Sequence, residues 1–462
     1  MKPRTYDIAI IGAGIIGTAL AHTLGTQGRS VLLLERDLSE PDRIVGELLQ
    51  PGGVKMLTKL GLSGCLEEID AIKVDGYEVI YHGKGVHIPY PPDPETGLKP
   101  QGRSFHHGRF VQKLRSAAAR APNVTVLEAT VKDLLKDTSS GNVLGVTCRR
   151  KGEKEDEHFL ASLTIAADGY ASNFRKLLVK KKTEVTSTFV ALELKDAVMP
   201  KPYHGHVLLG DNAPILLYQI STHFTRALID VRQKVPAGQM REHLQSRIKD
   251  LPEVLQPSFK EAIMARERYP SMPNSYLPAT VNTVPGLLVV GDANNMRHPL
   301  TGGGMTVAFS DVVLLRDFLS PANLPDLDDH YEVANTLADF HWQRKGSKTN
   351  GSSTINILSI ALYRLFAADS NELKVLQKAC FRYFERGGEC VNGPASLLAT
   401  TQRNPWVLFW HFFAVAFCGI SGLFAGAGWR VDRWVVGVVQ GVRVLWTACL
   451  VLFPYIFGEF RR

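Results

Sequence analysis

The stretch YDIAIIGAGIIGTALAHTLGTQGRSVLLLERD, residues 6–37, decides which fold the chain adopts. It begins with a short apolar run at 8–11, continues with apolar residues at helical spacing, and returns to a second apolar run at 31–34 that ends on Glu35. Short apolar runs without polar alternation are typical of strands buried on both faces of a parallel sheet. The order therefore predicts a βαβ unit of the dinucleotide-binding type.

Three glycines, Gly12, Gly14 and Gly17, lie between the first strand and the helix with the spacing G-x-G-x-x-G. The first permits a tight turn, the second lets backbone N–H groups approach a pyrophosphate, and the third lets the helix pack closely on the strand. Glu35 lies 23 residues after Gly12, where its carboxylate would accept hydrogen bonds from ribose hydroxyls and repel a 2′-phosphate. These features predict a dinucleotide site that does not hold NADP, but they do not choose between FAD and NAD, and a chance glycine loop is the alternative.

A second motif lies in TIAADGYASNFRK, residues 164–176, where an apolar strand ends in Asp168 and Gly169. Two interpretations fit it equally well. The acid lies at the edge of the dinucleotide site, or it caps the turn of an ordinary strand-turn-helix. The motif alone does not choose between them.

The third motif, GDANNMRHPLTGGGM at 291–305, indicates which cofactor is bound. An apolar strand delivers Asp292 at its carboxyl end, where ligands bind in open α/β sheets. The bare run 302–304 is followed by Met305 and a helical pattern, and a helix amino terminus without side chains can bring N–H groups against a planar, partly anionic ring. The motif therefore indicates a flavin, because a flexible glycine linker, the alternative, would not be followed by a helix.

Length, charge and cysteine usage exclude several other classes of protein. The 462 residues are enough for two or three domains, and the net charge of +8 suits an acidic partner or an anionic membrane surface. No basic helix interleaved with aromatic residues is present, so nucleic-acid binding is not expected. The six cysteines are far apart and never form CxxC, so neither a disulfide framework nor a metal site is indicated. Asp7 and the glycines after it interrupt the amino-terminal apolar run, so we expect no secretory signal and a body that stays in the cytosol.

Segments between the second and third motifs alternate apolar and polar residues at strand spacing, as in FVALEL, HVLLG, PILLYQI and RALIDV. The alternation predicts an antiparallel sheet. We interpret it as a roof over the flavin with an apolar inner face for a hydrocarbon, although a purely structural sheet would show the same pattern.

Two apolar segments near the carboxyl end, 406–428 and 434–457, are each long enough to cross a hydrocarbon core of about 30 Å as a helix. We predict a membrane-anchoring hairpin with Arg430 in its connection, and the alternative is a helical hairpin buried in the protein core. Whether the hairpin spans or dips into one leaflet stays open, with Arg443 and the glycines favouring the dip. Tryptophans occupy positions expected for a membrane interface: Trp406, Trp410, Trp429 and Trp434.

The order of the three motifs resembles that of the FAD-dependent monooxygenases of the aromatic-hydroxylase type. Within that group, five stretches resemble the squalene monooxygenase family, also called squalene epoxidases: ERDLSEPDRIVGELLQPGG, FHHGRF, LLYQIS, GDANNMRHPLTGGGMTVAFSD and ACFRYFERGGECVNGP. The likeness runs from about residue 5 to the carboxyl end. It implies an α/β fold, with a Rossmann-type FAD-binding domain, an antiparallel-sheet substrate domain and a C-terminal helical membrane-associated region.

We expect the first two of these domains to be discontinuous in sequence. The expected parts are FAD-binding at 1–75, 105–180 and 281–325, substrate domain at 76–104 and 181–280, and a helical region at 326–462 with the anchoring hairpin at 405–460.

The resemblance also implies the residues of the flavin site. Those expected to bind FAD are Gly12, Gly14, Ile15, Ile16, Gly17, Glu35, Arg36, Arg43, Leu48, Arg109, Val131, Asp168, Asp292, Gly302, Gly303, Gly304 and Met305. Tyr77 and Gln50 match a tyrosine and a glutamine that the family pairs beside the flavin, and they are the expected catalytic residues. By pattern alone, Arg109 fits a surface cation almost as well, and Tyr77 or Gln50 fits an ordinary half-buried polar residue.

Three histidines and one asparagine also lie in or near these motifs. His298 and the pair His106 and His107 are candidates for acid or base chemistry, but packing or hydrogen bonding near the cofactor is the favoured interpretation. Asn294 replaces the aromatic residue expected after Gly-Asp-Ala, and we expect it to reshape the rim of the pocket slightly.

The implied reaction is the epoxidation of squalene to (S)-2,3-oxidosqualene with O₂, through a flavin C4a-hydroperoxide, in sterol biosynthesis. Only one nucleotide fingerprint is present, so we expect no separate fixed site for NADPH. The resemblance implies that NADPH donates electrons indirectly, through the NADPH-dependent diflavin reductase of the endoplasmic reticulum, an acidic partner that a basic surface would attract. The same resemblance implies a location on the endoplasmic reticulum membrane with the catalytic domain facing the cytosol, and lipid droplets as a further location. Two alternatives stay open: a paralogous flavin epoxidase that acts on another polyprenyl compound in secondary metabolism, and a non-catalytic prenyl-lipid chaperone.

Overall fold

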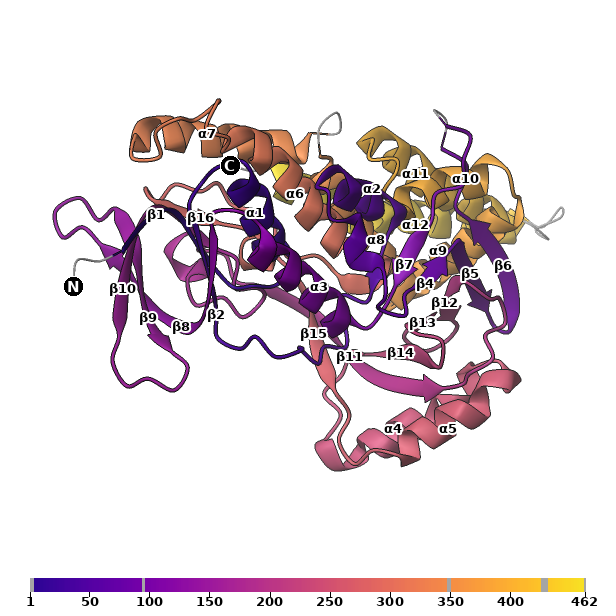
Figure 1. The fold of residues 1–462 in the computed structure, drawn as a ribbon. Coiled ribbons are helices and arrows are strands. Elements are labelled where there is room, and N and C mark those ends of the chain that lie inside the picture. The colour runs from indigo at the N-terminus through magenta and orange to yellow at the C-terminus, as the bar shows by residue number, and fades with distance from the viewer. Residues whose placement is uncertain (1–3, 94–95, 347–349, 425–430, 461–462) are drawn as a thin grey trace.

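The structure is a computed structural model that describes residues 4–93, 96–346, 350–424 and 431–460. It consists of two large sheets and a carboxyl-terminal group of helices (Figure 1). The amino-terminal strands lie at one end of the molecule and most helices of residues 371–460 lie toward the other, with much of the second sheet below those helices (Figure 1).

The first sheet has six strands, the antiparallel β9 (Val143–Arg150) and five parallel strands with the predicted βαβ unit at their centre. In spatial order the five parallel strands are β16 (Leu287–Val289), β10 (Glu157–Ala166), β1 (Arg4–Ile11), β2 (Val31–Glu35) and β8 (Val124–Lys136). Helix α1 (Ile15–Thr26) connects β1 to β2, so the predicted strand-helix-strand order is confirmed. All five strands direct their carboxyl ends to the same edge, where ligands bind in folds of this kind.

This sheet is the middle layer of three, which is why its strands are apolar throughout. Ile8 and Ile10 of β1 pack beneath α1, α3 (His107–Arg120) and α6 (Gly304–Phe318). Ala9 and Ile11 point to the opposite face, where β9 (Val143–Arg150) pairs antiparallel with the outer parts of β8 and β10. Neither face of the strand meets water, as the unbroken apolar run predicts.

The second sheet is the expected antiparallel sheet, with one exception. Its seven strands in spatial order are β15 (Ser271–Tyr276), β11 (Glu184–Lys195), β14 (Phe224–Val231), β13 (Ile215–Gln219), β12 (His204–Leu209), β5 (Gly76–Tyr81) and β6 (Lys84–Pro89). The exception is β5, which runs parallel to β12. A parallel pair needs a long crossover, and here the chain passes through α3, β8, β9 and β10 of the first sheet before it returns.

The two faces of the second sheet have different neighbours. Val207 and Leu228 pack toward the helical region, whereas Leu208 and Ile229 pack on α4 (Met240–Ser246) and α5 (Gln256–Met264). A small sheet of β3 (Leu48–Leu49), β7 (Gly102–Ser104) and β4 (Ile72–Val74) lies where the chain passes between the two large sheets. The helix α2 (Pro51–Lys59) follows β3 and packs on α6.

The carboxyl-terminal region is helical, as expected. Its helices are α7 (His330–Lys345), α8 (Ser352–Ala367), α9 (Asn371–Glu385), α10 (Glu389–Leu398), α11 (Pro405–Phe424) and α12 (Val431–Phe460). Helix α12 begins before and ends after the predicted segment, and it returns toward α7 and α8 at the interior of the molecule (Figure 1).

Helices α11 and α12 each have one buried face and one exposed apolar face. Leu408, Val415, Val444 and Leu452 belong to the same core as the second sheet, α8 and α9. The outward face carries a set of large exposed side chains: Trp406, Trp410, Phe417, Trp434, Val442, Trp446, Leu450 and Phe457. The buried face fits the interpretation of a hairpin packed in the protein core, and the exposed face fits the interpretation of a hairpin in a membrane. Two long apolar helices with such an exposed face are consistent with membrane association. The predicted connection, with Trp429 and Arg430, lies outside the described residues.

Candidate active site

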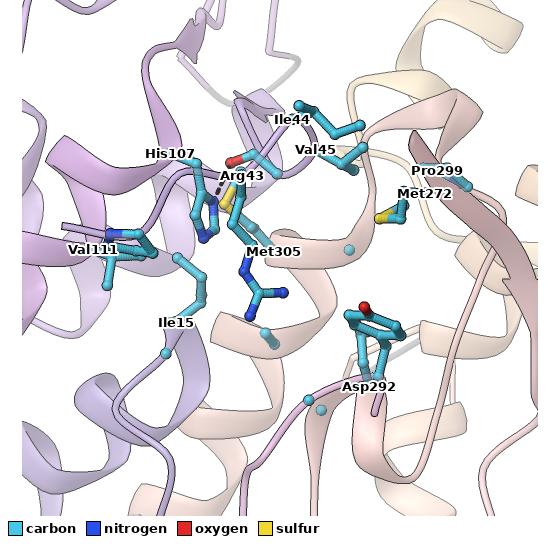
Figure 2. Close-up of a pocket in the computed structure, with 18 of the residues that line it drawn as sticks. Ile15, Arg43, Ile44, Val45, His107, Val111, Met272, Asp292, Pro299 and Met305 are labelled. Atoms are coloured by element: carbon cyan, nitrogen blue, oxygen red, sulfur yellow. Dashed lines mark hydrogen bonds between the residues drawn. The ribbon is translucent and has the colours of Figure 1, made fainter. Parts of the chain in front are cut away.

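A cavity of about 890 Å³ lies between the carboxyl ends of the first sheet and the second sheet (Figure 2). Residues expected at the flavin site form much of its lining: Gly12, Gly14, Ile15, Ile16, Glu35, Arg36, Arg43, Leu48, Tyr77, Val131, Asp168, Asp292, Gly302, Gly304 and Met305. Four expected residues, all within the described part of the chain, do not line it: Gly17, Gln50, Arg109 and Gly303. Figure 2 shows Arg43 reaching into this space between Ile15 and Asp292.

The three glycines of the loop between β1 and α1 differ in how closely other atoms approach them. Gly12 has φ +102°, and a Cβ atom there would lie 2.7 Å from the carbonyl oxygen of Ala167. A Cβ atom at Gly17 would lie 1.9 Å from the carbonyl oxygen of Gly12, so this glycine permits close packing and never reaches the cavity. At Gly14 no described atom beyond the chain neighbours lies within 4 Å of that position. Gly14 therefore leaves open the place where a phosphate group would approach the helix amino terminus.

Glu35 ends β2 beside this loop, and its carboxylate is held by two neighbours. Its Oε2 atom accepts a hydrogen bond of 2.8 Å from the Ala13 backbone N–H and lies 3.7 Å from the Arg115 guanidinium. Arg115 also donates to the carbonyl oxygens of Ala13 and Ser39, at 3.0 and 2.8 Å, and it lines the cavity. A cation at this place suits a nucleotide carrying two phosphates.

Arg109, which was expected in the site, lies on α3 like Arg115, but on a different face of that helix. Its guanidinium is 4.0 Å from the Asp70 carboxylate, and 43% of the side chain is exposed. The interpretation as a surface cation therefore fits the structure better. Sequence reasoning missed Arg115, although helical periodicity offered a signal, because Arg115 lies four residues after the buried Val111 on the inner face of α3.

The second and third motifs are tied together by Arg175. Its guanidinium donates to the carbonyl oxygens of Gly169, Asp292 and Ala293, at 3.2, 2.9 and 2.8 Å. The turn cap predicted for Asp168 is present, because its Oδ2 atom accepts from Asn173 N–H at 2.9 Å, while Oδ1 is buried without a partner among the described residues. A buried oxygen without a partner is costly, so this atom is available to a ligand in the cavity.

Asp292 is an exposed residue that lines the cavity, and many protein atoms lie around its carboxylate. This enclosure raises its pKa above the ordinary value for aspartate, and Arg297, Arg175 and Arg43 act in the opposite direction. A carboxylate in this state gains when a ligand supplies hydrogen-bond donors, such as hydroxyl groups.

The bare run 302–304 serves packing as well as access. Gly302 has φ +62°, and a Cβ atom there would lie 3.0 Å from Gln50 Nε2. A Cβ atom at Gly303 would lie 2.6 Å from Ile355 of α8, so a side chain there would meet α8, and Gly303 is not among the residues that line the cavity. Gly304 begins α6 and lines the cavity.

Gln50 and Tyr77 are linked by a hydrogen bond whose direction the surroundings fix. The Nε2 atom of Gln50 donates to the Thr301 carbonyl oxygen, at 2.7 Å, and to the Tyr77 oxygen. The Oε1 atom accepts from the Tyr90 hydroxyl at 2.6 Å. Burial raises the pKa of Tyr77 to about 12, although Gln50 acts to lower it, so Tyr77 stays protonated at neutral pH. Tyr77 lines the cavity and keeps its own hydrogen available to a group inside it.

A buried ion pair that the sequence did not reveal joins the loop after β2 to the second sheet. Glu47 accepts from Arg226 Nε and Nη2, at 2.9 and 2.8 Å, and from the Tyr218 hydroxyl at 3.2 Å. Glu47 and Tyr218 line the cavity beside an apolar wall that includes Val207, Leu216 and Leu228. The ion pair holds the loop that contains Glu47 against this apolar wall, along which a hydrocarbon would lie.

Of the three candidate histidines, His298 has a packing role. His298 is fully buried outside the cavity lining, stacks on Tyr363 with ring centres 3.8 Å apart, and has its pKa lowered by burial to about 3. His107 lines the cavity, donates from Nδ1 to the Gly46 carbonyl oxygen at 2.9 Å, and has its pKa lowered by burial to about 4. His106 does not line the cavity.

Asn294, expected at the rim of the pocket, is instead a buried residue whose side chain bonds to backbone atoms. Its side chain bonds to the N–H and the carbonyl oxygen of Thr280, at 2.9 and 3.0 Å, and it does not line the cavity.

Comparison with known proteins agrees with this geometry. A family model described as squalene epoxidase matches residues 160–433. Squalene epoxidase erg1 of Aspergillus fumigatus is 51% identical, and the match covers 99% of this chain and 95% of that protein. The chain belongs to the squalene epoxidase family. Squalene epoxidase erg1 of Schizosaccharomyces pombe is 45% identical, with 99% of each chain covered, and mouse squalene monooxygenase is 42% identical, with 98% of this chain and 78% of the mouse protein covered.

Solved structures share the fold of this squalene epoxidase family member. One is p-nitrophenol 4-monooxygenase PnpA of Pseudomonas putida, with a TM-score of 0.66 and 16% identity over 87% of this chain and 100% of that one. Another is PqsL of Pseudomonas aeruginosa, titled a probable FAD-dependent monooxygenase, with a TM-score of 0.62 and 18% identity over 89% of this chain and 100% of that one. The family resemblance and the fold class predicted from the sequence are thus confirmed.

Proposed function

We propose that this squalene epoxidase family member is an FAD-dependent monooxygenase that converts squalene to (S)-2,3-oxidosqualene in sterol biosynthesis. The reaction consumes one dioxygen, two electrons and two protons, and it yields the epoxide and one water. Membership of the family over the whole chain carries the proposal. The cavity supports it, because a nucleotide-type loop lies at one end and an apolar wall at the other.

The residues around the cavity fit FAD. The open position at Gly14, the unpartnered oxygen of Asp168 and the carboxylate of Asp292 offer what a pyrophosphate and hydroxyl groups need. The adenosine part would be held near Glu35 and Val131, and the ring near the start of α6. Bound flavin supplies the activation of dioxygen, and the protein supplies position, dryness and hydrogen bonds.

Residues of the chain position the substrate and hold one proton in place. The apolar wall with Val207, Leu216 and Leu228 would orient the hydrocarbon and exclude water from the reacting alkene. Tyr77, whose oxygen accepts from Gln50, presents its hydroxyl hydrogen to the cavity and would stabilise developing negative charge there. Tyr77 and Gln50 are therefore the proposed catalytic and positioning residues.

The source of electrons and the location are part of the same proposal. The sequence holds one dinucleotide fingerprint, which would be filled by FAD, so NADPH would act through a separate diflavin reductase. The net charge of +8 would favour an acidic partner of this kind. The exposed apolar face of α11 and α12 would hold the protein on the endoplasmic reticulum, facing the cytosol, or on lipid droplets, and would let squalene enter from lipid.

The test is a reconstituted reaction of the full chain with FAD, the reductase, NADPH, oxygen and squalene. We expect 2,3-oxidosqualene as the product, and flavin-loaded protein that forms none would contradict the proposal. A panel of other polyprenyl alkenes tests the paralogue alternative. Asn294, the one feature that suggested this alternative, does not line the cavity and so no longer favours it.

A further inference from the structure

The last turn of α12 enters the protein interior and ends in a cluster of buried polar groups. Glu459 is fully buried, and its carboxylate accepts hydrogen bonds from Asn356 Nδ2 at 2.9 Å, Tyr276 OH at 3.2 Å and Ser353 Oγ at 3.4 Å. Its backbone carbonyl oxygen accepts from the ammonium group of Lys345. Strand β15 and helices α7 and α8 therefore all hold the end of a largely apolar helix.

Glu459 and Arg297, at opposite ends of the Asn356 amide, together determine which way this amide faces. Asn356 presents its NH₂ group to the Glu459 carboxyl group, and it also donates to Asn295 Oδ1 at 3.1 Å. The Oδ1 atom of Asn356 then faces Arg297 and accepts from its Nε at 2.8 Å. The reverse orientation would place oxygen against a carboxylate and NH₂ against a guanidinium, and both contacts would be repulsive.

Arg297 carries this arrangement to the cavity. It is buried, lines the cavity, and donates from Nη1 to the carbonyl oxygen of Gly304, at 3.1 Å, and from Nη2 to the backbone and side-chain oxygens of Asn295, at 3.1 and 2.9 Å. Gly304 is the first residue of α6, the helix whose amino terminus would meet the flavin. Three hydrogen bonds in series thus link the end of the apolar helix to the glycine segment of the site.

We propose that Glu459 is a positioning residue for the flavin site: by fixing the Asn356 amide it holds Arg297 and the amino terminus of α6 in the geometry that binds the cofactor. Flavin binding then depends on docking of the terminal helix, the same helix that turns an exposed apolar face outward. The inference rests on the proposed function only in taking FAD as the ligand of the cavity.

The matched variants are Glu459→Leu, Glu459→Gln and Tyr276→Phe. Glu459→Leu removes the acceptor that orients Asn356, and we expect FAD affinity to fall about tenfold or more, the usual effect of losing a buried hydrogen bond to a charged group. Glu459→Gln keeps an oxygen for Asn356 and is expected to restore most of the affinity. Tyr276→Phe removes a hydrogen bond to the same carboxylate outside the path to Arg297, and it should leave the affinity near that of the parent protein.

The measurement is a fluorescence titration of the full-length apoprotein in detergent with FAD, accompanied by the melting temperature of each apoprotein. Asn356→Leu supplies a second route, because it breaks the path while Glu459 keeps Tyr276 and Lys345. It should lower the affinity like Glu459→Leu, and the double variant should lose no more than Asn356→Leu alone. Folded Asn356→Leu protein with unchanged FAD affinity, or additive losses in the double variant, would overturn the inference. Parent protein that binds no FAD would instead contradict the proposed function.

Discussion

Tyr90 donates its hydroxyl hydrogen to Gln50 Oε1 at 2.6 Å, while the Thr301 carbonyl oxygen, which can only accept, fixes which end of the Gln50 amide faces Tyr77. Since the amide must then present its NH₂ group to Thr301 and Tyr77, the Tyr77 oxygen acts as an acceptor. The arrangement is fully buried at Gln50, so water does not compete for these bonds. The result is a tyrosine held in one orientation, with its own hydrogen available at the cavity.

Tyr77→Phe removes this hydrogen while keeping the ring. We expect FAD to bind as before and the yield of epoxide per NADPH consumed to fall by at least about tenfold, the lower range for a positioned proton donor. Epoxide and hydrogen peroxide are measured in the same reaction. Tyr90→Phe is the control and should lose less, because Thr301 still orients Gln50. A Tyr77→Phe enzyme with normal coupling would remove Tyr77 from the mechanism.

Asp292→Asn separates cofactor binding from stability. Enclosure raises the Asp292 pKa, so the ionised carboxylate destabilises the empty protein at neutral pH, and removing the charge relieves this cost. We therefore expect FAD affinity to fall about tenfold or more while the melting temperature of the apoprotein stays equal or rises. Isothermal titration and thermal unfolding measure the two quantities. A fall in both would show that Asp292 stabilises the fold itself.

Arg115 and Arg109 form a matched pair on α3. Arg115→Ala is expected to weaken FAD binding, because this guanidinium holds both Glu35 and the Ala13 carbonyl at the glycine loop. Arg109→Ala should have little effect, since an exposed ion pair with Asp70 contributes on the order of 0–1 kcal/mol. Equal losses of affinity in the two variants would contradict the placement of the site.

His298 makes the protein sensitive to acid. Its pKa is about 3 in the folded protein and 6.5 in the reference state, so the unfolded chain takes up a proton first as the pH falls. Above about pH 6.5, His298 has no effect on the pH dependence of the free energy of unfolding. As the pH falls from 6.5 to 3, protonation of His298 in the unfolded chain lowers this free energy progressively. His298→Asn keeps an acceptor for Leu300 N–H and should reduce this acid dependence of unfolding, without changing the pH profile of epoxidation. A changed pH profile of epoxidation would instead indicate that His298 acts as an acid or base in the reaction.

The exposed face of α12 is tested by substitution and not by deletion. Removing 405–462 would strip Leu408 and Leu452 from the core that they share with the second sheet, so loss of function would be uninformative. Trp446→Glu alters a side chain that is 65% exposed on this face, and we expect weaker sedimentation with liposomes. Tyr331→Glu, on α7, is the control at an exposed aromatic residue outside the hairpin. Unchanged liposome binding of Trp446→Glu would argue against this face as the membrane contact.

Local pattern predicted the elements whose signal lies within one segment. The β1-α1-β2 unit and the helix after the third motif follow from apolar runs, spaced glycines and helical periodicity, and the structure contains each of them. The roles of Gly12 and Gly17 could also be predicted, because they depend on packing within that unit.

What the sequence did not reveal depends on contacts between distant segments. A side chain at Gly303 would meet Ile355 of α8, and no sequence pattern near the glycines indicates that contact. The Glu47 and Arg226 pair and the burial of Glu459 are likewise set by tertiary packing. An acid at the end of an apolar helix is more often solvated, and only the fold shows that this end turns inward.

The origin of the inserted oxygen tests the account most directly. The full chain, loaded with FAD and supplied with reductase, NADPH and squalene, is run under isotopically labelled dioxygen, and the product is analysed by mass spectrometry. The account predicts 2,3-oxidosqualene carrying one labelled oxygen atom. Flavin-loaded protein that consumes NADPH but gives no labelled epoxide would contradict it.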